Sequence, residues 1–530
     1  MPAAGSKRPG DGAAARLPEV ARALLAPGTY PEATKGVELV QTQMSFVFLT
    51  DQYVYKVKKP VNLGYLDYTT LEQRRLYCQR EVALNRRLCP EAYLAVVPIT
   101  RQPEGVALGG PGEPIEYAVK MRRLPQEAMM NVLLAGNRVS PEMVSRLAVK
   151  LADFHQHTAT GPDIDTFGGL ETITRNTEEN FSQTERYIPR TISQEQYRRI
   201  TQFTRDFIRQ HPARFRQRVD AGRIRDCHGD LHAAHICFSN GICIYDCIEF
   251  NERFRYCDVA SEVAFLTMDL DHYGRADLSR HFIKAYVSQS QDEALKGLLG
   301  FYRCYRAYVR GKVEGFKLDD PYIAPAEKAK ITGVARRYFS LAQAYTRPRP
   351  RLIITVGLVG SGKSTLAQAL AQRLGLVVIS SDVTRKQLAA VPATEHHFDS
   401  FDSGIYSAEF TRRTYDRMFA EAGAALADGW PVIIDASFIN AKERQTAREL
   451  ARDAGADFFI IECVLDETHT RQRLARRLKR GSASDGRWEI YPTQKERFEP
   501  VAGIPPANHV IIDTSGALSA LIKKIEARID

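Results

Sequence analysis

The sequence predicts a multidomain protein that ends in an α/β domain with a parallel sheet. With 530 residues, the chain is long enough for about three or four domain-sized units. Residues 347–351 read RPRPR, and alternating proline and arginine resist both helix and sheet, as expected of a linker. From residue 352 onward, short apolar strands alternate with helical patterns, which is typical of a parallel sheet covered by helices.

The composition is that of an ordinary globular protein, with 44% hydrophobic and 26% charged residues. No apolar run approaches the roughly 20 residues that span a bilayer, so we expect no membrane partner. Residues 1–16 are rich in alanine, glycine and proline and lack the apolar stretch of a signal peptide. We therefore expect residues 1–30 to be a disordered tail and the protein to be cytoplasmic.

The net charge of +10 suits a phosphorylated partner, whether ATP or a nucleic acid. The nine cysteines form no C-x-x-C pair, and those between Cys227 and Cys257 alternate with apolar residues. Reduced thiols in the core are the favoured interpretation, and a metal or redox cluster is the alternative. The sequence does not predict an oligomeric state.

The first half opens with two predicted strands, residues 45–49 and 52–58, which place Lys56 and Lys58 on one face. A helix over residues 70–88 follows, and its Glu81 could pair with such a lysine; the alternative is that these charges lie on the surface. Further elements are expected at residues 95–100 (strand), 103–114 (hairpin tip), 115–121 (strand), 143–155 (helix) and 194–210 (helix).

The most informative part of the first half is residues 228–250. It begins HGDLHAAHI, with Asp230 on a loop, and continues with a predicted hairpin, residues 236–245, that ends in Asp246. Two acidic side chains are thereby brought to one edge. One can orient an attacking hydroxyl and the other can hold magnesium, which is what phosphoryl transfer requires.

This segment resembles the H-G-D-x-x-x-x-N catalytic loop of aminoglycoside phosphotransferases and related small-molecule kinases, which share the two-lobed protein-kinase fold. The resemblance implies an α+β kinase-like domain with an N-lobe (31–125) and a helical C-lobe (126–345). It further implies that Asp230 is the catalytic base and Asp246 the metal ligand. Lys56 would bind the nucleotide phosphates, with Lys58 as the fallback, and Glu81 would be its ion-pair partner.

Two departures from the family pattern leave alternatives open. His235 stands where asparagine is expected, and a neutral imidazole can ligate a metal but suits magnesium less well than an amide oxygen. There is also no glycine-rich loop, so the turn before Ser45 would have to cover the phosphates. The domain is therefore either a kinase or a non-catalytic nucleotide sensor. We expect Asp258 to cap the helix that contains Glu262 and to brace the catalytic loop.

After the linker (346–351), residues 357–365 read GLVGSGKST and follow an apolar strand at residues 352–356. This is the G-x-x-x-x-G-K-[ST] pattern of a phosphate-binding loop, or P-loop, in its proper context between a strand and a helix. The glycines allow backbone N–H groups to wrap around phosphates, the lysine reaches the β- and γ-phosphates, and the serine hydroxyl can ligate magnesium. The predicted nucleotide ligands are Gly357, Gly360, Ser361, Gly362, Lys363, Ser364 and Thr365.

The next strand, residues 376–380, leads into Asp382 and Arg385. A strand that ends in Asp-x-x-Arg after a P-loop resembles the polynucleotide-kinase and zeta-toxin branch of P-loop kinases. That resemblance implies that Asp382 accepts the proton of the acceptor hydroxyl and that Arg385 holds a phosphate of the acceptor. The alternative for Asp382 is a helix N-cap. Residues 436–440 with Arg444 are similar to the substrate-facing loop of the same kinases.

Three further predicted strands, residues 431–435, 458–464 and 509–513, complete the P-loop domain (352–530). Asp435 ends the first of them, where a Walker B acid orients magnesium. Residues 470–480 crowd six basic side chains onto one helix. This helix is either a solvated face or a lid that closes on the phosphates, with Arg473, Arg477 and Arg480 as contacts.

Taken whole, the chain resembles bacterial proteins that fuse an aminoglycoside-phosphotransferase-like domain to a P-loop kinase-like domain. We therefore expect a bifunctional ATP- and magnesium-dependent phosphotransferase with two nucleotide sites, although GTP also fits the motifs. The acceptor would be a 5′-hydroxyl polynucleotide or a small metabolite. Two other hypotheses are a kinase-like half that only senses nucleotide, and a toxin-like kinase that acts on a nucleotide sugar.

Overall fold

The computed structural model describes residues 17–103, 105–320, 323–347, 349–392, 404–478 and 486–529, without the side chains of residues 477 and 478. These residues form two compact units. The first contains residues 17–179, 204–269 and 281–306, and the second contains residues 180–203, 270–280 and 307–529. The predicted linker, residues 346–351, therefore lies inside the second unit. Among the described residues, no helix is long and apolar enough to cross a bilayer.

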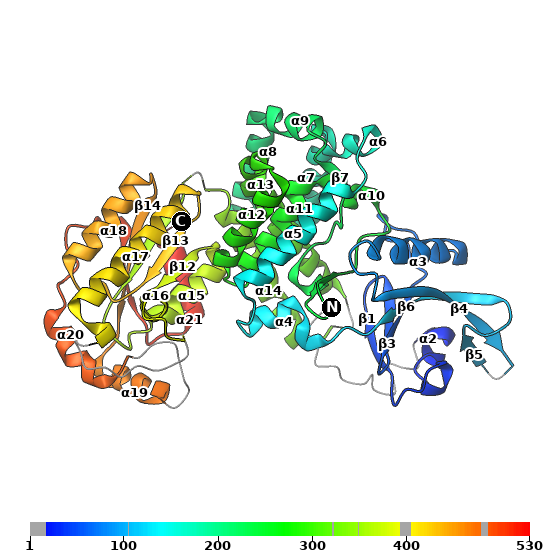
Figure 1. The fold of residues 1–530 in the computed structure, drawn as a ribbon, viewed down its shortest axis with the longest axis horizontal. Coiled ribbons are helices and arrows are strands. Elements are labelled where there is room, and N and C mark those ends of the chain that lie inside the picture. The colour runs from blue at the N-terminus through cyan, green and yellow to red at the C-terminus, as the bar shows by residue number, and fades with distance from the viewer. Residues whose placement is uncertain are drawn as a thin grey trace. The chain divides into compact units, whose positions relative to one another are not determined.

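The N-lobe is an antiparallel sheet of six strands in the order β1-β2-β3-β6-β4-β5 (Figure 1). β3 is central, with β2 on one side and β6 on the other, and its register pairs Lys56 with Val47 and Val119. β5 lies inside the predicted hairpin tip, where the sequence analysis expected no strand. The elements are α2 (Glu19–Ala23), β1 (Glu38–Gln41), β2 (Ser45–Leu49), β3 (Tyr53–Lys58), α3 (Leu71–Asn85), β4 (Tyr93–Gln102), β5 (Gly105–Leu108) and β6 (Pro114–Arg122).

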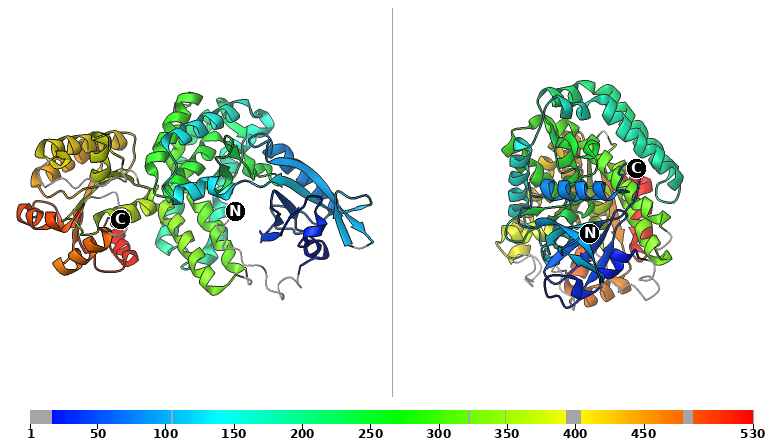
Figure 2. Two further views of the ribbon diagram at one scale, coloured as in Figure 1. Left: turned by 60° about the horizontal axis from the view of Figure 1, so that its bottom comes forward. Right: turned by 90° about the vertical axis from the view of Figure 1, so that its right-hand side faces the viewer.

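A helix covers each face of this sheet (Figure 2). On one face, Cys78 and Val82 of α3 pack against Val47 and Val54. α3 begins at a capping box in which Thr70 and Gln73 exchange side-chain and backbone hydrogen bonds.

On the other face of the sheet, residues 17–30 pack against the strands, so the predicted tail over residues 1–30 is wrong for this part of the chain. Leu17, Ala21, Leu24 and Tyr30 are buried against this face, and the short helix α2 lies among them. Apolar residues spaced along 17–30 gain more from this burial than from solvation, so this stretch belongs to the lobe. Residues 1–16 lie outside the described part of the chain.

The C-lobe is mainly helical, as predicted. Two short antiparallel pairs, β7 with β10 and β8 with β9, frame residues 228–250, which we call the catalytic segment after its predicted role. Its elements are α4 (Met130–Ala135), α5 (Pro141–His157), α6 (Pro162–Asp165), α7 (Leu170–Thr184), α8 (Gln194–Gln210), α9 (Pro212–Asp220), β7 (Ile224–Asp226), β8 (Ile236–Cys237), β9 (Cys243–Ile244), α10 (Glu252–Arg255), β10 (Tyr256–Asp258), α11 (Val259–His272), α12 (Ala276–Ser290), α13 (Lys296–Phe316) and α14 (Pro325–Ala344).

The P-loop domain is a parallel sheet of five strands in the order β12-β13-β11-β14-β15, with helices on both faces (Figure 1). α15 and α21 pack on one face, and α17 and α18 pack on the other. The elements are β11 (Arg351–Val356), α15 (Lys363–Leu374), β12 (Val377–Ser380), α16 (Ser381–Leu388), α17 (Ala408–Ala427), β13 (Val432–Asp435), α18 (Ala441–Asp453), β14 (Asp457–Val464), α19 (Glu467–Leu478), α20 (Tyr491–Arg497), β15 (His509–Asp513) and α21 (Leu518–Ile529).

The described residues at the junction between the two predicted domains belong largely to regular structure. Arg351 is the first residue of β11 and is buried, although the sequence analysis placed it in the linker. Within the second unit, α14 packs against α15, and Arg373 donates a hydrogen bond to Ser340 Oγ (3.2 Å). The proline–arginine pattern therefore marks a change of domain, and its last residue, Arg351, belongs to the sheet of the second domain.

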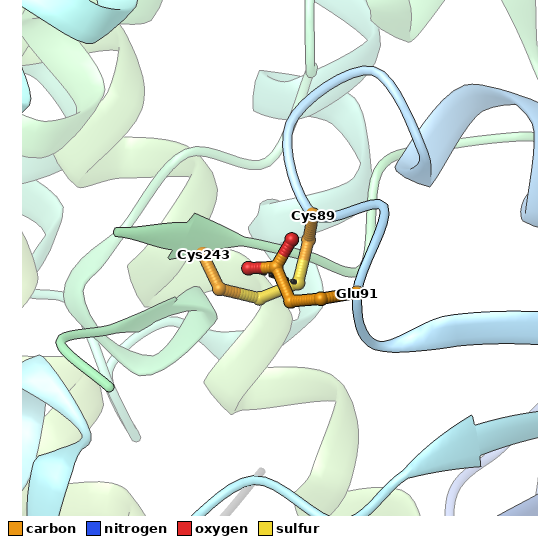
Figure 3. A group of neighbouring side chains, drawn as sticks. All are labelled: Cys89, Glu91 and Cys243. Atoms are coloured by element: carbon orange, nitrogen blue, oxygen red, sulfur yellow. Dashed lines mark hydrogen bonds between the residues drawn. A yellow bond between two sulfur atoms is a disulfide. The ribbon is translucent and has the colours of Figure 1, made fainter. Parts of the chain in front are cut away.

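The cysteines depart from the prediction of reduced thiols at one pair. Cys89, just after α3, and Cys243, the first residue of β9, form a disulfide with a Cα–Cα distance of 4.7 Å. Figure 3 shows this disulfide with the carboxylate of Glu91 beside it. The other seven cysteines are free, and most are buried. Because 154 residues separate the two partners, sequence spacing gave no signal for this pairing.

The thiol count tests this pairing directly. Alkylation of the unfolded chain without reductant should modify seven cysteines, and alkylation after reduction should modify all nine. Peptide mass spectrometry should find Cys89 linked to Cys243 in the unreduced sample. Nine reactive thiols before reduction would show that the disulfide is absent from the protein.

Candidate active sites

The first candidate site is built around the two lysines of β3. Lys56 Nζ contacts Glu81 Oε1 at 2.8 Å, and Lys58 Nζ contacts Glu81 Oε2 at 2.7 Å. Lys58 is almost fully buried and also bonds Glu249, whereas Lys56 retains some exposure. The structure thus contains the predicted pair of Lys56 with Glu81, and it places Lys58 behind that pair. The surface alternative for these charges is excluded.

Asp246 faces the same lysine from the other side. Lys56 Nζ donates to Asp246 Oδ1 at 2.7 Å. Burial by itself raises the pKa of the Asp246 carboxyl, but the nearby Lys56 charge outweighs it and holds the pKa well below the ordinary range. Asp246 has a φ of +64°, in the left-handed region where a side chain with a Cβ is strained. Strain of this kind is often retained where a side chain must point into a functional site.

The catalytic segment brings Asp230 close to Asp246. His228 Nδ1 accepts the backbone N–H of Asp230 (3.3 Å), and the other ring nitrogen contacts the carbonyl of Tyr245 (2.9 Å). Asp230 Oδ2 lies 3.6 Å from ring nitrogens of both His232 and His235. The Asp230 side chain remains one-third exposed, at 33%, so an acceptor hydroxyl can reach it.

His235 lies between the two acidic residues. Its Nδ1 is 2.9 Å from the carbonyl oxygen of Asp230, and its Nε2 is 3.5 Å from Asp246 Oδ2. Burial lowers the pKa of the His235 imidazole, against the opposing effect of the neighbouring carboxylates. The residue that replaces the expected asparagine therefore sits inside the site and not beside it.

Glu262 fixes the backbone of the catalytic loop, a function that the sequence analysis assigned to Asp258. Its carboxylate accepts the N–H groups of His228 (2.9 Å) and Gly229 (2.6 Å), and it contacts His155 Nε2 at 2.8 Å. Burial raises the pKa of Glu262, but the hydrogen bonds and nearby imidazoles outweigh it and lower the pKa to about 2. Asp258 does cap α11, because it accepts the N–H of Ala260 at 2.9 Å.

Asp269 and Ser45 each hydrogen-bond to a loop of the kinase-like domain. Asp269 Oδ2 accepts the N–H of Ala233 at 2.9 Å and so anchors the middle of the catalytic loop, which the sequence analysis missed. Ser45 begins β2 next to a turn, is buried, and donates its N–H to Thr42 Oγ1 at 2.9 Å. Its contact with nucleotide remains a prediction.

The second candidate site is the P-loop. Gly360 and Gly362 have φ values of +79° and +89°, which side chains rarely adopt. A Cβ on Gly357 would lie 2.4 Å from the carbonyl oxygen of Cys463, so only glycine fits there. The hydroxyl of Ser361 is buried without a hydrogen-bond partner in the structure. These observations fit a loop whose backbone is free to surround a phosphate.

Four polar side chains converge beside this loop. Lys363, the first residue of α15, donates to the carbonyls of Gly357 (2.9 Å) and Leu358 (2.8 Å). Burial raises the pKa of the Asp435 carboxyl at the end of β13. A hydrogen bond from Ser364 and the charge of Lys363 oppose that rise. The Asp382 charge acts on the same carboxyl and raises its pKa further. Thr365 follows on the exposed side of α15.

Arg385 and Arg444, the two arginines predicted on the acceptor side, both donate to backbone carbonyls. Arg385 is buried, and its guanidinium donates to the carbonyl of Ile405 (2.6 Å) and lies over the Tyr406 ring. Arg444 donates to the carbonyls of Phe438 and Glu499 and so joins two loops through their backbone. The role predicted for Arg385 at the acceptor therefore stays a prediction.

Of the three arginines that the lid hypothesis names, Arg473 is the one that the described part of the structure places at the P-loop. Its Nη1 donates to Thr514 Oγ1 (3.0 Å) and would lie 3.0 Å from a Cβ at Gly362. Arg480 and the side chain of Arg477 fall outside the described residues. The sequence analysis missed Gln494 of α20, whose Oε1 accepts the N–H of Val359 (2.9 Å) inside the loop.

Two families match the chain in the predicted order. Residues 69–298 match the family described as phosphotransferase enzyme family, and residues 352–501 match the family described as AAA domain. Uncharacterised proteins of Mycobacterium tuberculosis and Mycobacterium bovis are each 31% identical over 456 residues, which cover 86% of this chain and 88% of theirs. These matches confirm the predicted succession of a kinase-like domain and a P-loop domain.

Solved structures of kinases also match parts of the chain. A gluconokinase from Sinorhizobium meliloti is 22% identical with a TM-score of 0.24, covering 34% of this chain and 93% of its own. A glucosamine kinase in complex with glucosamine, ADP and inorganic phosphate is 16% identical with a TM-score of 0.33, covering 62% of this chain and 82% of its own.

Replacement of Glu262 should destabilise the kinase-like lobe in a pH-dependent way. In Glu262→Gln, one carboxylate oxygen becomes an NH₂ group that faces an N–H donor. We expect a loss of roughly 3 kcal/mol in the free energy of unfolding at pH 7. Because the pKa of Glu262 is about 2 in the folded state and 4.5 in the unfolded chain, the wild type keeps this advantage above about pH 4.5. The advantage declines as pH falls towards 2.

Urea unfolding read by hydrogen exchange on peptides from α11 measures this difference without interference from the P-loop domain. Glu72→Gln, at an exposed position in α3, removes the same charge and should change little. A gap between wild type and Glu262→Gln that widens from pH 5 to pH 3 would contradict the assignment.

Proposed function

The chain belongs to a family of two-domain proteins in which a phosphotransferase-family domain precedes a P-loop AAA domain, and we propose that it is an ATP-dependent phosphotransferase with two nucleotide sites. One observation supports this most strongly. The P-loop is accompanied by Lys363, Ser364, Asp382 and Asp435 as near neighbours. A loop that only held nucleotide would need no second acidic group at this position, whereas transfer to a hydroxyl needs a group that accepts its proton.

In the P-loop domain, we assign each of these side chains a step. Lys363 and Arg473 would stabilise the negative charge on the transferring phosphoryl group, because fixed donors in a partly buried site need no rearrangement during the reaction. Lys363 would have to leave the carbonyls of Gly357 and Leu358, and both contacts involve only its terminal amine. Asp382 would accept the proton of the acceptor hydroxyl as the new O–P bond forms.

Magnesium fits the oxygen donors of this site. Ser364 and Asp435 hydrogen-bond to each other, and together they present a hydroxyl and a carboxylate, which are donors that magnesium prefers. These two residues would hold the ion, which would supply charge neutralisation at the β- and γ-phosphates. The buried hydroxyl of Ser361 and the left-handed glycines provide the matching space for phosphate oxygens.

In the kinase-like domain, we propose an equivalent division of labour. Lys56, held between Glu81 and Asp246, would contact the nucleotide phosphates, with Ser45 at the turn above them. Asp246 and His235 would hold the metal, and Asp230 would orient the acceptor hydroxyl. The alternative that this domain only senses nucleotide is favoured by His235, which replaces the expected asparagine.

The acceptor is a hydroxyl compound of one of two classes. The net charge of +10 supports a polynucleotide with a free 5′-hydroxyl, and a small metabolite fits the same site residues. Salt dependence separates the two, because binding of a polyanion weakens steeply with ionic strength and binding of a small neutral acceptor does not.

Phosphoryl transfer from γ-labelled ATP to 5′-hydroxyl oligonucleotides, sugars, nucleotide sugars and aminoglycosides tests the proposal. We expect transfer to one class. Lys363→Ala should reduce that transfer by at least about 100-fold, because the phosphoryl group loses its main cationic partner. Asp382→Asn should reduce it by about 100-fold or more, because the general base is lost. Lys442→Ala, an exposed change on α18, is the matched control and should be neutral.

Two results would overturn parts of this assignment. Full transfer by Asp382→Asn alongside loss of transfer by Lys363→Ala would exclude Asp382 as the base. Transfer that survives Lys363→Ala but disappears in Asp230→Asn would move the observed activity to the kinase-like domain.

ATP turnover that Asp230→Asn abolishes in a Lys363→Ala background would exclude a purely sensing role for the kinase-like domain.

A further inference from the structure

The three histidines of the catalytic segment differ in which ring nitrogen carries the proton. His228 Nδ1 accepts the backbone N–H of Asp230, so in the neutral ring the proton is on Nε2, which faces the carbonyl of Tyr245. His232 Nδ1 accepts the backbone N–H of Ala234 at 3.3 Å, which likewise puts its proton on Nε2. In both rings, the nitrogen with the lone pair is already used by the protein backbone.

His235 has the opposite arrangement. Its Nδ1 lies 2.9 Å from the carbonyl oxygen of Asp230, and a carbonyl oxygen can only accept, so Nδ1 must carry the proton. In the neutral ring, Nε2 therefore holds the lone pair. This nitrogen faces Asp246 Oδ2 at 3.5 Å, which is too long for a normal hydrogen bond.

Two electron-pair donors thus face each other across a short gap in the site. The Asp246 carboxylate uses its other oxygen, Oδ1, for Lys56 at 2.7 Å, which leaves Oδ2 directed at the imidazole. The His235 side chain is only 7% exposed, whereas the Asp246 side chain is 40% exposed, so an ion can reach the gap from the Asp246 side. A gap of 3.5 Å between nitrogen and oxygen is one that a cation with bonds of about 2.0–2.2 Å can bridge.

The chemistry of this donor pair selects among cations. Magnesium prefers oxygen ligands in a near-ideal octahedron and binds imidazole poorly, whereas first-row transition metals accept imidazole nitrogen and carboxylate oxygen together. A backbone carbonyl on the remote nitrogen also fixes the tautomer of His235, as is usual for histidines that ligate such metals.

We propose that His235 Nε2 and Asp246 Oδ2 form a transition-metal site in the kinase-like domain that prefers a cation of the Mn²⁺ type over Mg²⁺. The two nucleotide sites would then differ in metal: the donors at the P-loop are oxygens, and those at the kinase-like site include a nitrogen. This inference refines the metal site of the proposed function and rests on it for the presence of a metal. His235 stands where the family pattern has asparagine, and it would then change which metal binds without abolishing the metal site.

Electron spin echo spectroscopy of bound Mn²⁺ tests this site without any turnover. The full chain is mixed with Mn²⁺ and inorganic triphosphate, neither of which contains nitrogen. Wild type should show ¹⁴N modulation from a directly bound imidazole. His235→Asn should lose this modulation, and His232→Asn, on the neighbouring ring, should keep it. The P-loop donors Ser364 and Asp435 are oxygens and contribute none.

Competition by Mg²⁺ supplies a second measurement. Displacement of Mn²⁺ from wild type should need at least about ten-fold more Mg²⁺ than displacement from His235→Asn, because the variant replaces nitrogen with an amide oxygen. Equal melting temperatures of the two proteins would show that the variant is folded, and a variant that fails to fold is replaced by His235→Gln.

The outcomes separate the inference from the proposed function. Absence of ¹⁴N modulation in wild type, or its persistence in His235→Asn, would overturn the site, and so would equal Mg²⁺ displacement. Modulation that follows His235 in a protein without transfer activity would uphold the metal site and overturn only the proposed reaction.

Discussion

Two lysines that share one buried carboxylate organise the kinase-like site. Lys56 and Lys58 lie on the same face of β3, and Glu81 of α3 forms an ion pair with each of them. Burial of an unpaired charge costs several kcal/mol, so neither lysine is stable there without its partners. The remaining partners, Asp246 and Glu249, come from the segment after β9. The same network therefore ties the sheet to α3 and sets the position of Asp246.

The two proposed phosphate sites are built by different physical means. In the kinase-like domain, the site depends on paired charges, and Glu262 and Asp269 fix the loop by accepting its N–H groups. In the P-loop domain, the site depends mainly on backbone conformation, because left-handed glycines lead directly into the start of α15, and N–H groups at a helix start favour anions. Substitutions should therefore affect the first site through charge and the second through backbone geometry.

Much of this arrangement could be predicted from the sequence where a local pattern carries the information. The alternation in residues 53–58 placed both lysines on one face, and the P-loop motif placed Lys363 at a helix start, as the structure has them. Sequence could not choose between a surface and a buried Glu81, because that depends on packing of α3 against the sheet. The disulfide of Cys89 with Cys243 depends likewise on contacts between residues far apart in the chain.

The errors of prediction have the same origin. Residues 17–30 were expected to continue the tail predicted from the composition of residues 1–16, yet the open face of the sheet buries their apolar side chains. Bracing of the catalytic loop was assigned to Asp258, which caps the helix start, whereas Glu262, one helical turn later, reaches the loop amides. Each error concerns which partner a side chain finds, and sequence spacing does not specify that.

The presence of two independent nucleotide sites is the central claim, and the stoichiometry of binding tests it most directly. Isothermal titration of the full chain with a non-hydrolysable ATP analogue should give two molecules bound per chain. Lys363→Ala and Lys56→Ala should each leave one, and the double variant should bind none. A single bound nucleotide in the wild type that disappears in Lys363→Ala would show that the kinase-like domain does not bind nucleotide.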